Sequence, residues 1–163
     1  LARTGPEALK TVPAIEQAVE RFRRNSQISA FLQLEWDIAQ LPAEVEIQVL
    51  RIVQEALANI RKHSQANAVR VLMRASKNGE YMVLIEDDGV GIQKKVLDGG
   101  PGEHLGLKIL HERAARIGGD LKIESDSGEG TRVILTFQCP QNPSGNEPIM
   151  EVAFSPRSTG TVP

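Results

Sequence analysis

Several features that define other classes of protein are scarce in this chain. Its single cysteine, Cys139, excludes an internal disulfide and a cysteine-cluster zinc site, and it indicates a reducing compartment. Aromatic residues are only 4% of the chain and 19 basic residues face 21 acidic ones, which argues against a nucleic-acid-binding surface. No apolar run approaches the roughly 18–20 residues of a membrane span, and there is no signal-peptide pattern. These absences indicate a soluble protein without a nucleic-acid partner.

The chain does contain enough apolar residues for one core, since 163 residues with 40% hydrophobic content fit a single domain with tails. Helical periodicity and strand-like alternation follow one another along the sequence. The predicted helices are 6–24, 43–63 and 107–117. The predicted strands are 29–38, 67–75, 81–86, 120–125 and 131–137. Helices that cover one face of such strands give an α+β fold, a two-layer α/β sandwich with a mixed, mostly antiparallel sheet.

Breaks in these patterns suggest where the domain begins and ends. Asn78-Gly79 predicts a hairpin turn, and residues 92–105, rich in glycine, predict a long loop of the kind that covers active sites. Beyond Pro140 the chain is rich in Pro, Ser, Gly and Asn, which predicts a disordered or weakly docked tail in which 149–154 could pair locally. We therefore expect a linker helix at 1–27, a domain at 28–138 and a tail at 139–163.

The helix predicted at 43–63 carries the first group of candidate site residues. Glu55, Asn59 and Lys62 or His63 lie three or four residues apart, so they share one face of the helix. A carboxylate, an amide oxygen and a cation on one face would suit Mg²⁺ and a phosphate tail, because Mg²⁺ shares its oxygen ligands with phosphates and water. The alternative is an ordinary solvated helix face with cations near its C-terminus.

A second candidate group follows the strand at 81–86, where Asp87-x-Gly89-x-Gly91 enters the long loop. A carboxylate accepts hydrogen bonds only, so Asp87 suits an exocyclic amine such as that of adenine. The two glycines allow the backbone to approach a flat ligand closely. The alternative is a plain Asp-Gly turn, which is common.

Two further glycine motifs occur downstream. Gly102-x-His104-x-Gly106-Leu107 opens the helix at 107–117, and the free N–H groups of a helix start suit a phosphate. Gly128-x-Gly130-Thr131 precedes the last strand, where an ordinary hairpin turn is the alternative. Each motif is weak alone, but four in this order form a strong pattern.

In this order and spacing the motifs resemble the ATP-binding domain shared by gyrase, heat-shock chaperone, histidine kinase and mismatch-repair ATPases, a Bergerat-type fold. The resemblance covers about residues 28–138. The chain is most similar to sensor histidine kinases of the nitrate/nitrite-sensor type in one sequence motif, Gln-Glu-Ala-Leu-x-Asn-x-x-Lys-His-Ser-x-Ala.

The resemblance implies a role for each motif. Asn59 would hold Mg²⁺, Glu55 would assist in placing the metal or water, and Lys62 and His63 would contact phosphates. The second glycine motif would cap the phosphates of ATP, through Gly102, His104, Gly106 and Leu107.

At the other end of the nucleotide, Asp87 would bind the adenine amine. Gly89 and Gly91 would line the base pocket, and Thr131 would support Asp87 from the neighbouring strand.

The chain departs from the family at the phosphate acceptor. Sensor kinases carry an acceptor histidine followed by an acidic residue on a helix before this domain, whereas the three histidines here, His63, His104 and His111, all lie within it. His111 precedes Glu112 but belongs to the helix at 107–117, so we interpret it as a surface or packing residue.

The leading hypothesis is therefore the catalytic domain of a two-component kinase that uses ATP and Mg²⁺. Its expected partners are its own missing dimerisation and phosphotransfer domain and a response regulator. The parent protein would be a homodimer, and this domain would lie on the cytoplasmic side of a bacterial inner-membrane sensor. The alternatives are an anti-sigma-factor serine kinase and a catalytically silent nucleotide-binding module.

Overall fold

Three helices and five strands make up the part of the chain that the computed structural model describes, residues 11–35, 41–76, 78–92 and 105–139. The predicted order of elements is confirmed, and their ends shift by a few residues. The elements are α1 (Thr11–Asn25), β1 (Ser29–Glu35), α2 (Ala43–His63), β2 (Ala68–Ala75), β3 (Glu80–Asp87), α4 (Leu105–Arg116), β4 (Asp120–Ser125) and β5 (Thr131–Gln138). Residues 93–104 of the predicted loop, the tail beyond Cys139, the predicted helix residues 6–10 and the predicted strand residues 36–38 lie outside the described residues.

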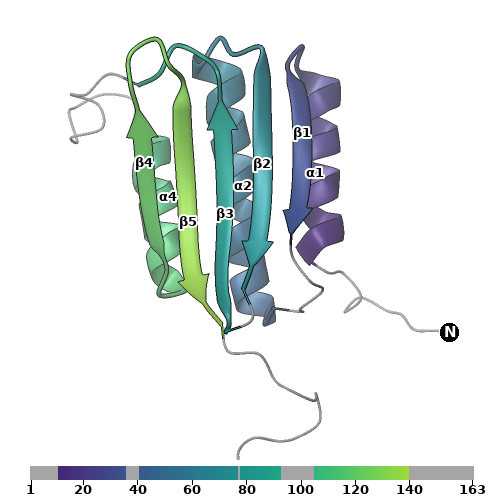
Figure 1. Ribbon diagram of the computed structural model, residues 1–163, viewed down its shortest axis with the longest axis vertical. Helices are drawn as coiled ribbons and strands as arrows, with labels where there is room; N and C mark the ends of the chain where they lie inside the picture. Colours follow the sequence, from purple (N-terminus) through teal and green to yellow (C-terminus); the bar gives the residue numbers. More distant parts are fainter. Residues whose placement is uncertain (1–10, 36–40, 77, 93–104, 140–163) are drawn as a thin grey trace, which may run out of the picture.

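The strands form one sheet in the order β1-β2-β3-β5-β4 (Figure 1). β1 runs parallel to β2, and every other neighbouring pair is antiparallel. Gly79 has φ +86° in the turn between β2 and β3, a conformation that glycine adopts without strain. The predicted mixed, mostly antiparallel sheet is therefore confirmed.

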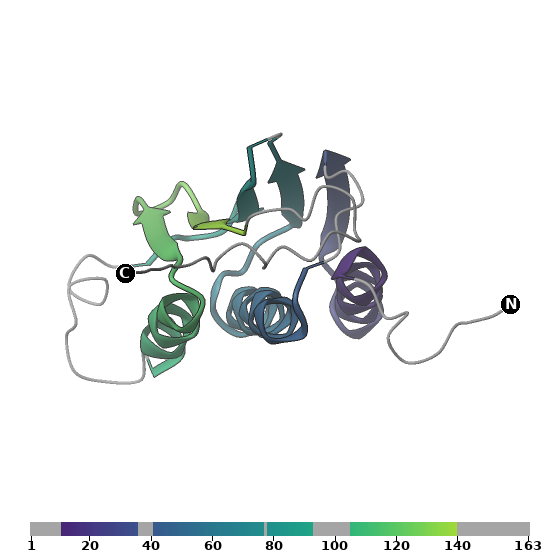
Figure 2. The ribbon, with the colours of Figure 1, turned by 90° about the horizontal axis from the view of Figure 1, so that it is seen from below.

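All three helices cover the same face of this sheet (Figure 2). α2 lies in the middle of the helical layer, and its apolar stripe at helical spacing is buried. The buried residues of α2 are Val49, Ile52, Val53, Ala56, Leu57 and Ile60. Strand residues of one parity complete the core, among them Tyr81 and Phe137, whose stacked rings lie 5.1 Å apart. Among the described residues, no helix is both long and apolar enough to cross a membrane.

α1 packs into the same core as the rest of the domain. Ile15, Val19 and Phe22 are buried in the cluster that α2 and the sheet share. The hydroxyl of Thr11 donates a 2.7 Å hydrogen bond to Glu46 in the first turn of α2. The helix predicted as a linker within residues 1–27 thus packs its apolar stripe on the same core as α2 and the sheet. The division of the chain into a linker, a domain and a tail stays a prediction.

Candidate functional site

The sequence motifs meet at one end of the sheet. β3 ends there at Asp87, α2 ends nearby at His63, α4 begins with Leu105, and the turn between β4 and β5 closes the same end (Figure 1). Four segments that are far apart in sequence therefore surround one rim.

Asp87 points into the helical side of the sheet because it continues the alternation of Val83 and Ile85 along β3. Asp87 is only 6% exposed, and its Oδ1 accepts a 2.7 Å hydrogen bond from the N–H of Gly89. Burial raises the pKa of this carboxyl, while backbone N–H groups of Gly89 and Thr131 oppose the rise. Burial therefore makes the ionised form of Asp87 less favourable, and the hydrogen bond from Gly89 fixes its orientation at the rim. A carboxylate that binds a ligand needs such a fixed orientation.

The neighbouring Asp88 has a structural role, which the sequence analysis did not identify. It is exposed, and its Oδ1 accepts hydrogen bonds from the N–H groups of Asn67 at 2.8 Å and Ala68 at 3.0 Å. These bonds lower the pKa of Asp88. Asp88 therefore fixes the connection between α2 and β2 against the end of β3.

The first glycine motif lies against the C-terminal end of α2. A Cβ on Gly89 would overlap the carbonyl oxygen of Ser64, which accepts a 2.8 Å hydrogen bond from the N–H of Val90. Ser64 is buried, and its hydroxyl donates to the Ile60 carbonyl and accepts from the N–H of Ala66. Gly89 is thus needed for backbone packing as well as for any role in a base pocket, and Ser64 is a second residue that the sequence analysis missed.

The third glycine motif lies beside Asp87. Gly130 has φ +87°, and a Cβ there would overlap the carbonyl oxygen of Asp87. Thr131 is the cross-strand partner of Asp87 in the β3–β5 ladder. The sequence-based placement of Thr131 next to Asp87 therefore agrees with the register, while its role in binding stays a prediction.

Ser125, at the end of β4, connects this motif to the first one. Its hydroxyl donates to the Gly130 carbonyl at 3.0 Å, accepts from the N–H of Ile92 at 2.7 Å and lies 2.9 Å from the hydroxyl of Thr131. Because a serine hydroxyl has one proton, Thr131 is the donor in the last contact. Ser125 thus anchors Ile92, the first residue of the long loop predicted at 92–105, a role without any local sequence signal.

The predicted metal ligands lie next to the start of α4. A Cβ on Gly106 would lie 2.9 Å from Glu55 Oε2 and 3.0 Å from Asn59 Oδ1, so both side chains reach this glycine. No cluster of three His, Cys, Asp or Glu side chains suited to a metal occurs among the described residues. Two protein oxygens do fit Mg²⁺, which takes its remaining ligands from phosphates and water.

The other predicted site residues are placed less tightly. Lys62 and His63 are exposed in the last turn of α2, on the rim, where cations complement the helix dipole. Leu107 is half-buried and packs on the core. Gly102 and His104 lie outside the described residues.

With this geometry in view, comparison with known proteins identifies the family. The sequence pattern of the histidine kinase-, DNA gyrase B- and HSP90-like ATPases matches residues 44–141, more than half of the chain. The chain belongs to this ATPase family. The matched segment contains every described candidate site residue, while the binding role of each stays a prediction.

Curated relatives of this ATPase domain are bacterial sensor proteins. The chain is 31% identical to the nitrate/nitrite sensor protein NarQ of Escherichia coli over 126 residues, which are 77% of this chain and 22% of NarQ. It is 33% identical to the sensor histidine kinase LiaS of Bacillus subtilis over 121 residues, 73% of this chain and 31% of LiaS. The chain thus spans between a fifth and a third of these relatives.

Solved structures share the fold of the ATPase domain. The histidine kinase domain of the blue-light activated kinase EL346 from Erythrobacter litoralis has a TM-score of 0.70 at 19% identity, covering 85% of this chain and 65% of that one. The mycobacterial sensor histidine kinase MprB has a TM-score of 0.64 at 22% identity, with 82% and 97% covered. At these identities the likeness establishes the architecture alone.

Proposed function

We propose that this chain is the ATP-binding catalytic domain of a two-component sensor histidine kinase. It transfers the γ-phosphoryl group of ATP to a histidine on a separate dimerisation domain, from which a response regulator receives it. The observation that carries this proposal is the approach of Glu55 and Asn59 to Gly106 at the rim where Asp87 is buried. The kinship to NarQ and LiaS supports it.

In this proposal the rim divides into a base end and a phosphate end. Asp87 accepts a hydrogen bond from the adenine amine, while Gly89 and Gly91 leave room for the base and Thr131 steadies Asp87. Asn59, with Glu55, holds Mg²⁺, which neutralises phosphate charge during transfer. Lys62 and His63 contact the phosphates, and the start of α4 at Gly106 presents N–H groups to them. Gly102, His104 and Leu107 belong to the same phosphate end.

The proposal extends to the parent protein. The parent is a homodimer whose dimerisation domain carries the acceptor histidine, and the domain lies on the cytoplasmic side of a membrane sensor. Phosphoryl transfer depends mainly on positioning and electrostatic stabilisation, so the isolated domain keeps its chemistry while its substrate histidine is supplied separately.

The test supplies that histidine on a separately produced dimerisation domain from the parent protein or a related kinase. With labelled Mg-ATP, acid-labile phosphate is expected on the added piece and not on this chain. The label is expected to be weak, because a covalent linker provides an effective concentration of about millimolar, which micromolar mixing does not match.

Asn59→Ala should abolish this label, whereas Asn78→Ala, the same change in the β2–β3 turn at the other end of the sheet, should preserve it. Acid-stable phosphate on a serine would instead identify a serine kinase. Nucleotide binding without any label on related acceptors would indicate a silent binding module. Equal labelling by the Asn59 variant would show that the metal site is misplaced.

A further inference from the structure

β1 is an edge strand of the sheet and pairs with β2 on one side only. The N–H of Ser29 donates to the carbonyl of Asn67, and in a parallel ladder this sets which residues face the partner strand. Backbone groups of Ala30, Leu32 and Leu34 consequently face outward. The Ala30 carbonyl accepts hydrogen bonds from Arg23 at 3.2 and 2.7 Å, whereas no described residue bonds the outward groups of Leu32 and Leu34.

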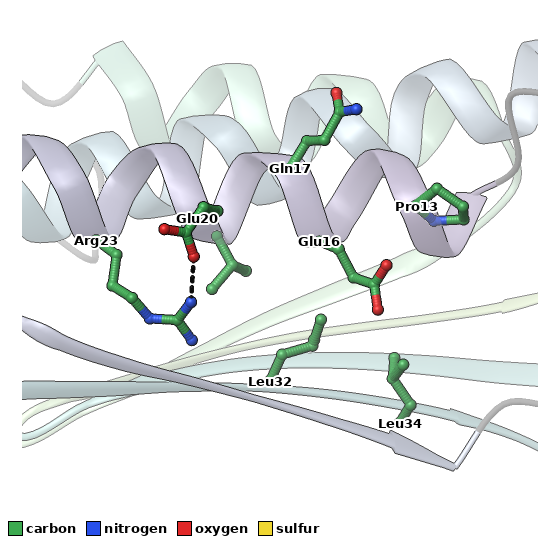
Figure 3. A pocket seen from close by; sticks show the side chains of 8 residues that line it. Pro13, Glu16, Gln17, Glu20, Arg23, Leu32 and Leu34 are labelled. Atoms are coloured by element: carbon green, nitrogen blue, oxygen red, sulfur yellow. Dashed lines mark hydrogen bonds and ion pairs between the residues drawn. The ribbon is translucent and has the colours of Figure 1, made fainter.

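A groove of about 540 Å³ runs along this edge between β1 and α1. Val19, Leu32 and Leu34 give it an apolar floor, and Figure 3 shows the side chain of Glu16 pointing from α1 toward the two leucines. Of the four large hydrophobic residues that are most exposed in the described part of the chain, two belong to β1: Phe31 at 58% and Leu34 at 39%. Open backbone groups beside a groove with an apolar floor suit an added strand.

The position of α1 restricts what can add to this edge. α1 lies beneath β1 at the outer border of the helical layer (Figure 2). If a second copy continued the sheet, the two α1 helices would be separated by about one strand spacing, ~4.8 Å, whereas packed helices need about 8–10 Å. An extended segment without a helix of its own avoids this clash.

We propose that residues 149–154 of this chain, Ile-Met-Glu-Val-Ala-Phe, add to the edge of β1 as an antiparallel sixth strand. The segment alternates two sets of side chains, and most of its residues are apolar or β-branched. With Met150, Val152 and Phe154 on the helical side, it covers Leu32 and Leu34. The opposite orientation would turn Glu151 toward the groove, where the carboxylate of Glu16 repels it and Glu20 already pairs with Arg23.

The length of the chain allows this arrangement. β1, β2 and β5 run in the same direction, so β5 ends at the border of the sheet where β1 also ends. A strand added outside β1 would lie four strand spacings from β5, about 19 Å. The connecting residues 140–148 span up to about 30 Å when extended. A segment that enters from this end must run antiparallel to β1. Residues 1–10, by contrast, contain no alternating apolar run.

Amide hydrogen exchange, resolved by NMR, tests the proposal by comparing the full chain with a chain that ends at Cys139. The outward amides of Ala30, Leu32 and Leu34 should exchange roughly tenfold or more slowly in the full chain, because a paired edge opens less often. The amides of Phe31, Gln33 and Glu35 face β2 and serve as internal controls that should not change. Equal exchange of the outward amides in both chains would overturn the proposal.

Substitutions within the tail test the same pairing without changing any residue of the hydrophobic core. Val152→Pro should remove the protection, since proline can neither donate to a ladder nor fit its interior, whereas Thr161→Pro in the same tail should retain it. The protection should not depend on protein concentration. Protection that grows with concentration would instead assign the edge to a second copy, and protection that survives Val152→Pro would assign it to another segment.

Discussion

Replacing Asp87 by asparagine should separate nucleotide binding from folding. The two side chains have nearly the same shape, and an amide oxygen can still accept the hydrogen bond that Gly89 donates at 2.7 Å. Burial raises the pKa of Asp87, so its ionised form is less stable in the folded domain than in the unfolded chain. The ligand-free Asp87→Asn domain should therefore have an equal or higher free energy of unfolding at neutral pH.

Nucleotide binding should respond in the opposite direction. In the proposed site the carboxylate accepts a hydrogen bond from the adenine amine, and the amide NH₂ of asparagine can oppose that donor. Losing a charge-assisted hydrogen bond costs about 1.5–3 kcal/mol, which is roughly a tenfold to hundredfold loss of affinity. Calorimetric titration with a non-hydrolysable ATP analogue, together with urea unfolding of the same samples, measures both effects.

Asp88→Asn is the matched control, because it makes the same change one residue away. The Asp88 carboxylate receives two backbone N–H groups, and its lowered pKa means that its charge stabilises the fold. This variant should lose stability and keep most of its affinity for the nucleotide. Unchanged affinity in Asp87→Asn, or a loss of affinity that only parallels a loss of stability, would refute the assignment of Asp87.

Other predictions address the remaining contacts of the rim. Gly106→Ala places a Cβ about 3 Å from the ends of Glu55 and Asn59, so Mg²⁺-dependent nucleotide affinity should fall in titrations with and without EDTA, while Lys108→Ala on the same helix should not change it. Ser125→Ala removes the acceptor for the Ile92 N–H, so hydrogen exchange at Ile92 should accelerate and nucleotide affinity should fall. The stability of wild type relative to Asp87→Asn should decrease as pH rises from 3.8 through the raised pKa of Asp87, as measured by urea unfolding in a pH series.

Local patterns explain why much of the fold could be predicted from the sequence. The helix at Ala43–His63 was predicted with its observed bounds, because Pro42 marks its start and an apolar stripe continues through its length. The inward direction of Asp87 follows from the alternation of β3, since it has the same parity as Val83 and Ile85. Helix bounds and the direction of a strand side chain depend on residues only a few positions away. One sequence therefore suffices to predict them.

Contacts between distant segments could not be predicted in this way. The parallel pairing of β1 with β2 and the position of β5 between β3 and β4 depend on the packing of the whole sheet. Asp88 bonds an N–H 21 residues away, and Ser125 bonds one 33 residues away. An Asp or a Ser in a polar stretch has no periodic signal that would indicate such a partner, so both residues were missed.

The glycines explain why motifs that are weak singly are informative together. Each stands where two distant segments touch: Gly89 against the end of α2, Gly130 against the end of β3, and Gly106 against Glu55 and Asn59. A β-carbon at any of them would separate a different pair of elements. The spacing between motifs is therefore set by the elements that return the chain to the rim, the β2–β3 hairpin in one case and α4 with β4 in the other. The order and distance of the glycines thus reflect the closure of a single site, which an isolated Asp-Gly or Gly-x-Gly turn does not require.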